Sequence, residues 1–485
     1  MNRFFRYLII VLATIGLFAA CKPNDKEAPA LSDSVRISAF SLVSDTTTLH
    51  NLDKVFFTID LENGLIYNAD SLPVGTPINK LVISLSTDDA SAVNITSVDS
   101  TFSYLTYKTK PINFTQPVNV EVISRSKNYT KNYTIKVNVH KTDPDRLFWG
   151  GVQYASLPGS GKLNQQRTVR YNELLHCFME RDNQFFMATT SHPSQEWQIT
   201  PLQLSFTPQF STLCTAENQL FVLDENNTLY TSVDGIEWTS TQTTFSTIIG
   251  SLNNTLLAIT QEGNDYYHDL YPRPQGYTPQ PVAADFPISG HSDILTYNSA
   301  WLTSPQGMIV GGRTATGELT GAVWGFDGTR WAKLNTQLPV RENATFFSYV
   351  TFYVDNNWVT TEMPTWFIIG GNNDNIAMRD VWISNNYGIT WESGGLDLTL
   401  PGYIIARSNA SVVICEDPIN STISEWTSID TPAIPRGYSR RHTFGATSTS
   451  LVPYIYMFGG ETIDKRQLDQ VWRGVINRLR FEPIP

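Results

Sequence analysis

Apolar and polar residues alternate along much of the first third of the chain. In residues 133–140 (YTIKVNVH) every odd position is apolar or aromatic and every even position is polar. A period of two puts the apolar residues on one face of an extended strand, so this segment predicts a half-buried antiparallel strand. The same alternation returns in residues 55–61, 80–86 and 118–124, and turn signals such as LPVG at 72–75 separate these runs.

We therefore expect residues 34–142 to form one all-β domain. About seven short strands in roughly 105 residues are typical of an immunoglobulin-like (Ig-like) β-sandwich. This segment lacks the paired cysteines and the tryptophan that mark true Ig domains, so its topology stays open. The polar residues 141–146 (KTDPDR) are centred on a proline and predict a domain boundary.

A different repeat follows this boundary. Each unit has an apolar strand that ends in Gly-Gly, a polar hairpin region, then Val-Trp and a closing aromatic residue. Three units follow this plan, at residues 308–331, 367–391 and 456–481. The spacing from Gly-Gly to Val-Trp is nearly constant, and a weaker fourth unit at residues 229–238 keeps the second half of the plan.

These units resemble the kelch repeat. The resemblance implies that each unit is a four-stranded blade and that residues 146–485 close radially into a kelch-like β-propeller. At about 50 residues per blade this segment holds six or seven blades, and seven are favoured. The interval between Gly371 and Gly460 leaves the count open, because it holds either a further blade or one long insertion.

Two local motifs predict hairpins between outer blade strands. Residues 384–391 (SNNYGITW) fit the Asp-box pattern, and residues 232–238 (SVDGIEW) are a degenerate copy. In such a hairpin the short polar side chain bonds its own turn, glycine takes a positive φ, and tryptophan fastens the turn to the sheet. The motif resembles the Asp boxes of sialidases, where its role is structural, so it predicts no activity.

The first 21 residues carry an export signal. Arg3 and Arg6 precede a short apolar run, and small residues then lead to Cys21. The run is too short for a bilayer span, which predicts a signal peptide over residues 1–21. A cysteine at this place resembles the bacterial lipobox and implies lipidation of Cys21, with the acyl chains holding the protein to a membrane. A plain secretory peptide and an uncleaved membrane helix are the alternatives.

Residues 22–33 are polar and contain two prolines, which predicts a flexible tether. Asp25 and Glu27 resemble a loose form of the signal that carries Bacteroidota lipoproteins to the outer face of the outer membrane. An ordinary linker is the alternative.

The whole chain is similar to an uncharacterised family of Bacteroidota lipoproteins that carry a domain of unknown function. Residues 53–76, 453–460 and 470–483 carry this resemblance. It implies an N-terminal β-sandwich-like domain and a C-terminal kelch-like propeller, and it brings no established activity. With the lipobox it predicts a lipid-anchored protein of the cell outer membrane, on its periplasmic or its surface-exposed face.

Charge and cysteine content narrow the choice of partner. The formal net charge is −11 and no basic run is present, which excludes a nucleic-acid partner. Cys177, Cys214 and Cys415 are far apart and form no metal-ligand pattern. An exported protein accommodates either one disulfide with one thiol left over or three buried free thiols.

Arginines near the predicted innermost strands form the candidate binding site. Arg341 and Arg407 each follow a proline, and residues 436–442 (RGYSRRH) form the densest polar cluster. Guanidiniums gathered at one channel mouth would hold a carboxylate or a sulfate group bidentately. The alternative is that each arginine bonds loop carbonyls of the next blade. The candidate ligand-binding residues are Arg341, Arg407, Arg436, Tyr438, Arg440, Arg441 and His442.

Motifs for catalysis are absent from the sequence. The Arg-Ile-Pro start of sialidases, histidine pairs at metal-binding spacing and a phosphate-binding glycine loop are all missing. We therefore expect no catalytic residues, no metal and no cofactor. Trp301, Trp358 and Trp366 either stack on sugar rings or belong to the blade core.

The favoured function is a non-enzymatic binding propeller for a glycan or an envelope protein. A glycan-processing enzyme with a glycosidase-like or lyase-like activity and a structural scaffold in an outer-membrane assembly are the alternatives.

Overall fold

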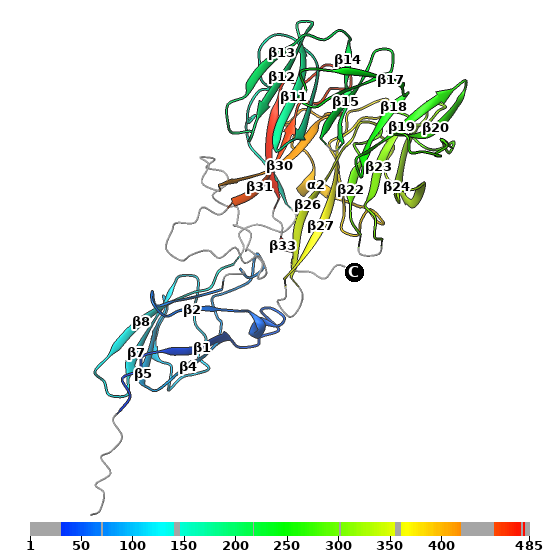
Figure 1. Ribbon diagram of the computed structural model, residues 1–485. Helices are drawn as coiled ribbons and strands as arrows, with labels where there is room; N and C mark the ends of the chain where they lie inside the picture. Colours follow the sequence, from blue (N-terminus) through cyan, green and yellow to red (C-terminus); the bar gives the residue numbers. More distant parts are fainter. Residues whose placement is uncertain are drawn as a thin grey trace, which may run out of the picture. The chain divides into compact units, whose positions relative to one another are not determined.

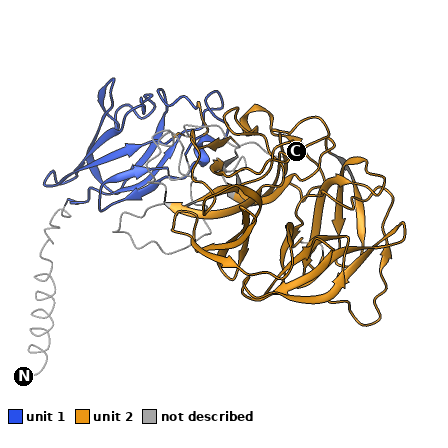
Figure 2. Cartoon of the chain, turned by 90° about the horizontal axis from the view of Figure 1, so that it is seen from above, with its two compact units in different colours: residues 1–72, 76–138 blue, residues 73–75, 139–485 orange. Residues whose placement is uncertain are grey.

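The computed structural model describes residues 31–68, 71–139, 146–216, 218–299, 302–354, 360–418, 451–476 and 479–480. These residues form an all-β structure with two compact units. Unit 1 contains residues 1–72 and 76–138, and unit 2 contains residues 73–75 and 139–485 (Figure 2). In the described part of the chain, no helix has the length and the apolar character that a membrane crossing needs.

Unit 1 consists of a six-stranded sheet and a two-stranded sheet (Figure 1). The larger sheet has the order β2-β3-β8-β7-β5-β6, and β1 pairs with β4 in the smaller one. All the pairs are antiparallel except β3 with β8. The elements are β1 (Ile37–Leu42), the 3-10 turn η1 (Leu52–Lys54), β2 (Thr58–Asp60), β3 (Leu65–Tyr67), β4 (Ile83–Thr87), β5 (Ala90–Thr96), β6 (Thr101–Ser103), β7 (Val118–Ser124) and β8 (Thr130–Lys136).

The alternating pattern sets which face of each strand is buried. In β8, Tyr133 and Ile135 are buried while Thr134 and Lys136 are exposed, so the predicted period of two is confirmed there. Tyr104 joins the two sheets, because its hydroxyl accepts the backbone N–H of Leu85 in β4 at 2.9 Å. The apolar faces of the two sheets therefore close a common core.

Unit 2 is a β-propeller of radially arranged sheets (Figure 1). We number the six blades in chain order. Blade 1 contains β10 (Leu163–Tyr171), β11 (Leu174–Arg181), β12 (Gln184–Thr190) and β13 (Gln198–Leu202). Blade 2 contains β14 (Pro208–Ala216), β15 (Gln219–Asp224), β16 (Thr228–Ser232) and β17 (Thr239–Thr244). Blade 3 contains β18 (Thr247–Leu252), β19 (Thr255–Glu262), β20 (Asp265–Tyr271) and β21 (Gln280–Pro281).

The second half of the ring follows the same plan. Blade 4 contains β22 (Leu295–Tyr297), β23 (Gln306–Arg313), β24 (Leu319–Phe326) and β25 (Trp331–Gln337). Blade 5 contains β26 (Thr345–Val354), β27 (Thr360–Ile369), β28 (Val381–Ser384) and β29 (Glu392–Ser393), with β33 (Leu479–Arg480) parallel to β26 and the short helix α2 (Gly395–Leu398) after β29. Blade 6 contains β30 (Ser411–Pro418), β31 (Leu451–Phe458), β32 (Val471–Ile476) and β9 (Leu147–Trp149).

Blade 6 closes the ring from both ends of the unit. Its outermost strand β9 comes from the start of the unit and pairs with β32. The innermost strands β30 and β10 are neighbours, as are β10 and β14. A sheet shared by the first and last parts of unit 2 fastens the ring, because opening it breaks the β9–β32 hydrogen bonds.

The described residues form six blades, whereas the sequence favoured seven. The difference lies in the interval between Gly371 and Gly460. The two strands β30 and β31 pair directly with each other along their whole length, so this interval supplies the inner hairpin of blade 6. Residues 419–450, between these two strands, lie outside the described part.

The Gly-Gly pairs stand where the backbone of one blade meets the next. Gly371 has a φ of +86°, and a Cβ atom there would lie 2.8 Å from the carbonyl oxygen of Glu342. Its N–H donates to the carbonyl of Arg407 at 3.0 Å. Neither the conformation nor the space suits a side chain, which explains the repeated glycine.

The two Asp-box segments form the predicted hairpin turns. The N–H of Gly388 donates to Ser384 Oγ at 2.9 Å, and Trp391 Nε1 donates to the carbonyl of Gly388 at 3.1 Å. In the degenerate copy, Trp238 Nε1 donates to the carbonyl of Gly235 at 3.0 Å. Both glycines have a φ of +76°, so the structural role predicted for this motif is confirmed.

Buried cysteines and tryptophans belong to the blades. Cys177, Cys214 and Cys415 are free thiols, which settles the two alternatives in favour of no disulfide among them. Trp366 is 1% exposed and packs in the core between blades 4 and 5. Trp301 and Trp358 lie outside the described residues.

Candidate functional site

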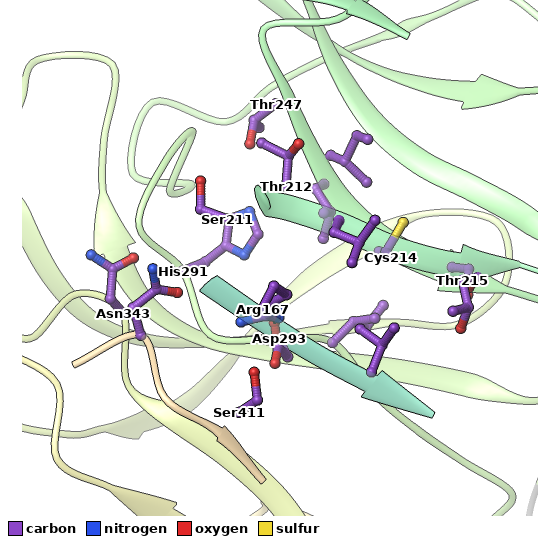
Figure 3. Close-up of a pocket in the computed structure, with 18 of the residues that line it drawn as sticks. Arg167, Ser211, Thr212, Cys214, Thr215, Thr247, His291, Asp293, Asn343 and Ser411 are labelled. Atoms are coloured by element: carbon purple, nitrogen blue, oxygen red, sulfur yellow. The ribbon is translucent and has the colours of Figure 1, made fainter. Parts of the chain in front are cut away.

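A cavity of about 690 Å³ lies on the axis of the propeller. Its wall comes from the innermost strands β10, β14, β18 and β30 and from residues 289–296, which lead into β22 (Figure 3). Because successive side chains of a strand point to opposite faces, each inner strand sends part of its residues toward the axis and part into its blade.

An ion pair crosses this cavity. Arg167, on β10 of blade 1, donates through Nη2 to Oδ1 of Asp293, which lies two residues before β22 of blade 4. In a ring of six, blades 1 and 4 face each other across the axis. Figure 3 shows the two side chains close together in the middle of the pocket.

The two partners differ in how they are held. The side chain of Arg167 is only 9% exposed, whereas that of Asp293 is 52% exposed. Arg167 Nε is buried and has no hydrogen-bond partner within the described chain. A guanidinium offers five N–H donors, and the single contact with Asp293 leaves most of this capacity unused.

One mouth of the cavity is built from a repeated backbone conformation. Gly290, Asn343 and Asn409 all have a left-handed φ, of +62°, +52° and +55°. The N–H of Asn343 donates to the carbonyl of Gly290 at 2.6 Å, and the N–H of Asn409 donates to the carbonyl of Asn343 at 2.7 Å. This chain of bonds links blades 4, 5 and 6 around the mouth. The two carboxamides line the cavity and have no hydrogen-bond partner among the described residues.

Hydroxyl groups supply most of the remaining polar lining. Ser211 and Thr212 come from β14, Thr247 from β18 and Ser411 from β30 (Figure 3). The hydroxyl of Thr212 is used within blade 2, because it donates to the carbonyl of Gln209 at 2.8 Å and accepts the N–H of Leu223 at 3.0 Å, and Ser411 Oγ accepts the N–H of Thr168 at 3.2 Å. The imidazole of His291 lies beside them, with Nδ1 2.8 Å from the carbonyl of Ser292. Burial lowers the pKa of His291, so its ring is neutral at pH 7.

The structure puts Arg341 inside the propeller wall and away from this cavity. Its side chain is 0% exposed and donates to Asp380 at 2.7 and 3.1 Å and to the carbonyl of Gly370 at 3.0 Å. Arg341 precedes β26, and both partners belong to the same blade 5. Its own carbonyl accepts the N–H of Gly312 in blade 4 at 2.8 Å. The side chain is therefore a clamp within blade 5 and does not face the cavity, whereas the alternative to ligand binding placed its partners in the next blade.

Arg407 repeats this arrangement one blade further on. It donates to the carbonyl of Gly459 at 2.7 Å and to Oε1 of Gln470 at 2.9 Å, both in blade 6. Burial lowers its pKa to about 10, so the guanidinium remains charged at neutral pH. Arg341 and Arg407 therefore do not form the expected ring of arginines at the channel mouth, because their guanidiniums form hydrogen bonds inside the blades.

The other predicted site residues lie outside the described part of the chain. These are Cys21 and the loop residues Arg436, Tyr438, Arg440, Arg441 and His442.

The cavity offers binding groups, and its chemistry is limited. Among the described residues that line it, Asp293 is the single carboxylate. Glycosidases of the usual kind use two carboxyl groups that flank the scissile bond. No group of three or more His, Cys, Asp or Glu side chains in the described chain is placed to hold a metal ion. The site is thus suited to hold a ligand by hydrogen bonds and charge.

Sequence reasoning missed the residues that line this cavity. One signal was present, since residues 341–345 (RENAT) and 407–411 (RSNAS) repeat the same pattern, with the left-handed asparagine two positions after the clamp arginine. The pairing of Arg167 with Asp293 had no comparable signal, because the two residues are 126 positions apart and only the closure of the ring brings them together.

Comparisons with known proteins agree with the fold. A family model described as "DUF6242 beta propeller domain" matches residues 143–484, and one described as "Domain of unknown function (DUF6242) N-terminal domain" matches residues 31–137. No protein among the curated sequences matches the chain.

Similar solved structures include two of a Trypanosoma rangeli sialidase. One is a mutant displaying trans-sialidase activity, with a TM-score of 0.33, and the other is a complex with the inhibitor DANA, with a TM-score of 0.36. Both are 9% identical over 68% of this chain, which covers 58% and 59% of their lengths. A likeness of this degree carries no functional argument.

Proposed function

We propose, starting from the fact that this chain belongs to the DUF6242 family, that its propeller is a non-enzymatic binding module whose axial cavity holds a small, hydroxyl-rich ligand such as a glycan unit. The observation that carries the proposal is the polar axial cavity with unsatisfied groups. Its volume of about 690 Å³ falls in the range of ligand pockets, roughly 300–1,000 Å³.

The polar groups of the cavity match the chemistry of sugar hydroxyls. The carboxamides of Asn343 and Asn409 each offer two donors and an acceptor, and serine and threonine hydroxyls both donate and accept. A sugar hydroxyl needs both kinds of partner at once. Because the inner strands and the segments just before them hold these groups on a closed ring, little conformational freedom is lost when a ligand enters.

We favour binding over catalysis because one carboxylate, that of Asp293, lines the described part of the cavity. A glycosidase of the usual kind needs a second carboxyl group near Asp293, and the described lining provides none. A scaffold role places no demand on the channel, so it gives no reason for a buried Arg167 Nε held there without a partner in the described chain.

The N-terminal sequence bears on where the protein is located in the cell. We infer that Cys21 is lipidated and that the protein is anchored to the outer membrane, with unit 1 between the anchor and the propeller in the order of the chain. The support is the signal-peptide pattern with a cysteine after small residues. Mass spectrometry of the N-terminal peptide from membrane fractions tests it, since Cys21→Ser abolishes acylation and the acyl mass is expected only with cysteine.

Isothermal titration calorimetry of purified full-length protein against a panel of monosaccharides and short glycans tests the binding function. We expect saturable binding that Asn343→Ala and Asn409→Ala weaken together. Product analysis of the same mixtures separates binder from enzyme, because cleavage of any glycan would contradict the non-enzymatic assignment. Binding that survives both asparagine substitutions unchanged would move the site away from this cavity.

A further inference from the structure

We propose that the axial cavity selects a carboxylate-bearing sugar, and that Asp293 occupies the place of the ligand carboxylate on Arg167 until the sugar acid displaces it. This inference rests on the proposed binding function and names the ligand class and the competing group.

Charge in the cavity favours an anion. The described lining holds two arginines, Arg167 and Arg170, and one aspartate, Asp293, so 2 − 1 leaves a charge of +1. The whole chain carries −11. A cavity of opposite sign to the rest of the protein concentrates small anions, and charge in a confined space with protein walls is less screened than at the surface.

The guanidinium of Arg167 has hydrogen-bond donors that Asp293 does not use. The guanidinium is almost fully buried, and its Nε is left without a partner in the described chain. A buried donor without a partner is costly. A ligand carboxylate with two oxygens can bond Nε and an Nη together, which is the favoured geometry of arginine with a carboxylate. Asp293, in contrast, is bonded only by Nη2 of Arg167.

Asp293 is the partner that can leave. Its side chain is about half exposed. The backbone next to it is held by hydrogen bonds between Ser292 and Val310, and does not depend on the ion pair. The N–H of Ser292 donates to the carbonyl of Val310 at 3.0 Å, and Ser292 Oγ accepts the N–H of Val310 at 3.0 Å. Rotation of the Asp293 side chain toward solvent therefore frees Arg167 without unfolding the blade edge.

The groups around the ion pair set the rest of the ligand. Hydroxyls of Ser211 and Thr247 line the same cavity as the guanidinium (Figure 3), and Ser411 Oγ, which accepts the N–H of Thr168 at 3.2 Å, keeps its own proton to donate. A molecule with one carboxylate and several hydroxyls uses both features, and a sugar acid has that composition. The ligand is then either a free sugar acid or the acidic unit of an oligosaccharide, which share this chemistry.

Calorimetry with D-glucuronate and D-glucose, matched except for the carboxylate, tests the proposal on purified full-length protein. The wild type is expected to bind glucuronate more tightly than glucose, with an affinity that falls as salt is raised. The variant Asp293→Asn removes the competing charge, so the ratio of glucuronate affinity to glucose affinity should rise about fivefold or more. A glucuronate-terminated disaccharide in a parallel titration distinguishes the free acid from the oligosaccharide unit.

Two further variants make the outcomes decisive. Arg167→Gln is expected to remove the preference for glucuronate, and Asp285→Asn, which alters the exposed pair with Lys333, is expected to change nothing. If neutral sugars bind and Asp293→Asn gives no gain for glucuronate, the displacement proposal is overturned while the binding function stands. If neither sugar nor the disaccharide binds the wild type or Asp293→Asn, both fall together.

Discussion

Replacing the clamp arginine of blade 5, Arg341, should destabilise the propeller by removing bonds that hold the start of this blade to the segment between β27 and β28. In Arg341→Met the side chain keeps much of its volume and loses its charge. Two hydrogen bonds to Asp380, at 2.7 and 3.1 Å, and bonds to the carbonyls of Gly370 at 3.0 Å and Pro339 at 3.1 Å are lost. The arginine is 0% exposed, so water does not replace these contacts in place.

The size of the loss follows from the groups left behind. Removing one partner of a buried ion pair costs about 3–5 kcal/mol, because the other charge stays without compensation. Asp380 is 36% exposed and keeps a bond from Trp382 Nε1 at 2.7 Å, which reduces its part of the cost. We therefore expect Arg341→Met to lower the free energy of unfolding by about 3 kcal/mol.

Urea unfolding followed by tryptophan fluorescence measures this loss for the propeller alone. All 12 tryptophans lie between residues 149 and 472, so unit 1 contributes no tryptophan signal. Arg330→Met is the matched control, because its pair with Asp327 is 3.7 Å long and its side chain is 78% exposed; we expect a change below about 0.5 kcal/mol. The double variant Arg341→Met, Asp380→Asn should recover about 1 kcal/mol. A loss for Arg341→Met no larger than the Arg330 control would refute the clamp.

Three further changes probe the propeller. Gly371→Ala puts a Cβ against Glu342 O at a φ of +86° and should lower the free energy of unfolding by about 2 kcal/mol or more. The control Gly317→Ala, whose Cβ would meet nothing within 4 Å, should lower it by about 1 kcal/mol. Chemical denaturation measures both losses, and equal losses would contradict the close approach. Burial lowers the pKa of His268 to about 4, so the folded protein does not bind the proton that the unfolded chain takes up near pH 6.5. The free energy of unfolding should therefore fall as the pH drops from 6.5 to 4, by up to about 1.4 kcal/mol per pH unit. If the dependence of this free energy on pH is unchanged in His268→Phe, His268 is not its origin. Burial raises the pKa of the Cys177 thiol to about 12, so iodoacetamide at pH 8 should label it only after unfolding, as peptide mass spectrometry shows; labelling of the native protein would contradict its burial.

The local pattern of residues was enough to predict the elements and their kind. The period of two in residues 133–140 determined which side chains of β8 are buried, and the Asp-box segments formed the expected turns. Gly-Gly pairs marked the junctions between blades, because a backbone that must approach another backbone excludes a Cβ atom. These features are encoded within ten or so neighbouring residues, so the sequence displays them directly.

The role of each arginine and the identity of the site were decided by tertiary structure. In sequence, Arg341 and Arg407 look like arginines that line a channel. Their guanidiniums instead bond Asp380 and Gln470, which are 39 and 63 positions away and lie in the same blade as each arginine. Arg167 and Asp293 meet only because six sheets close and bring opposite blades face to face. Contacts between residues so far apart depend on the number of blades and on ring closure, and no local pattern carries that information.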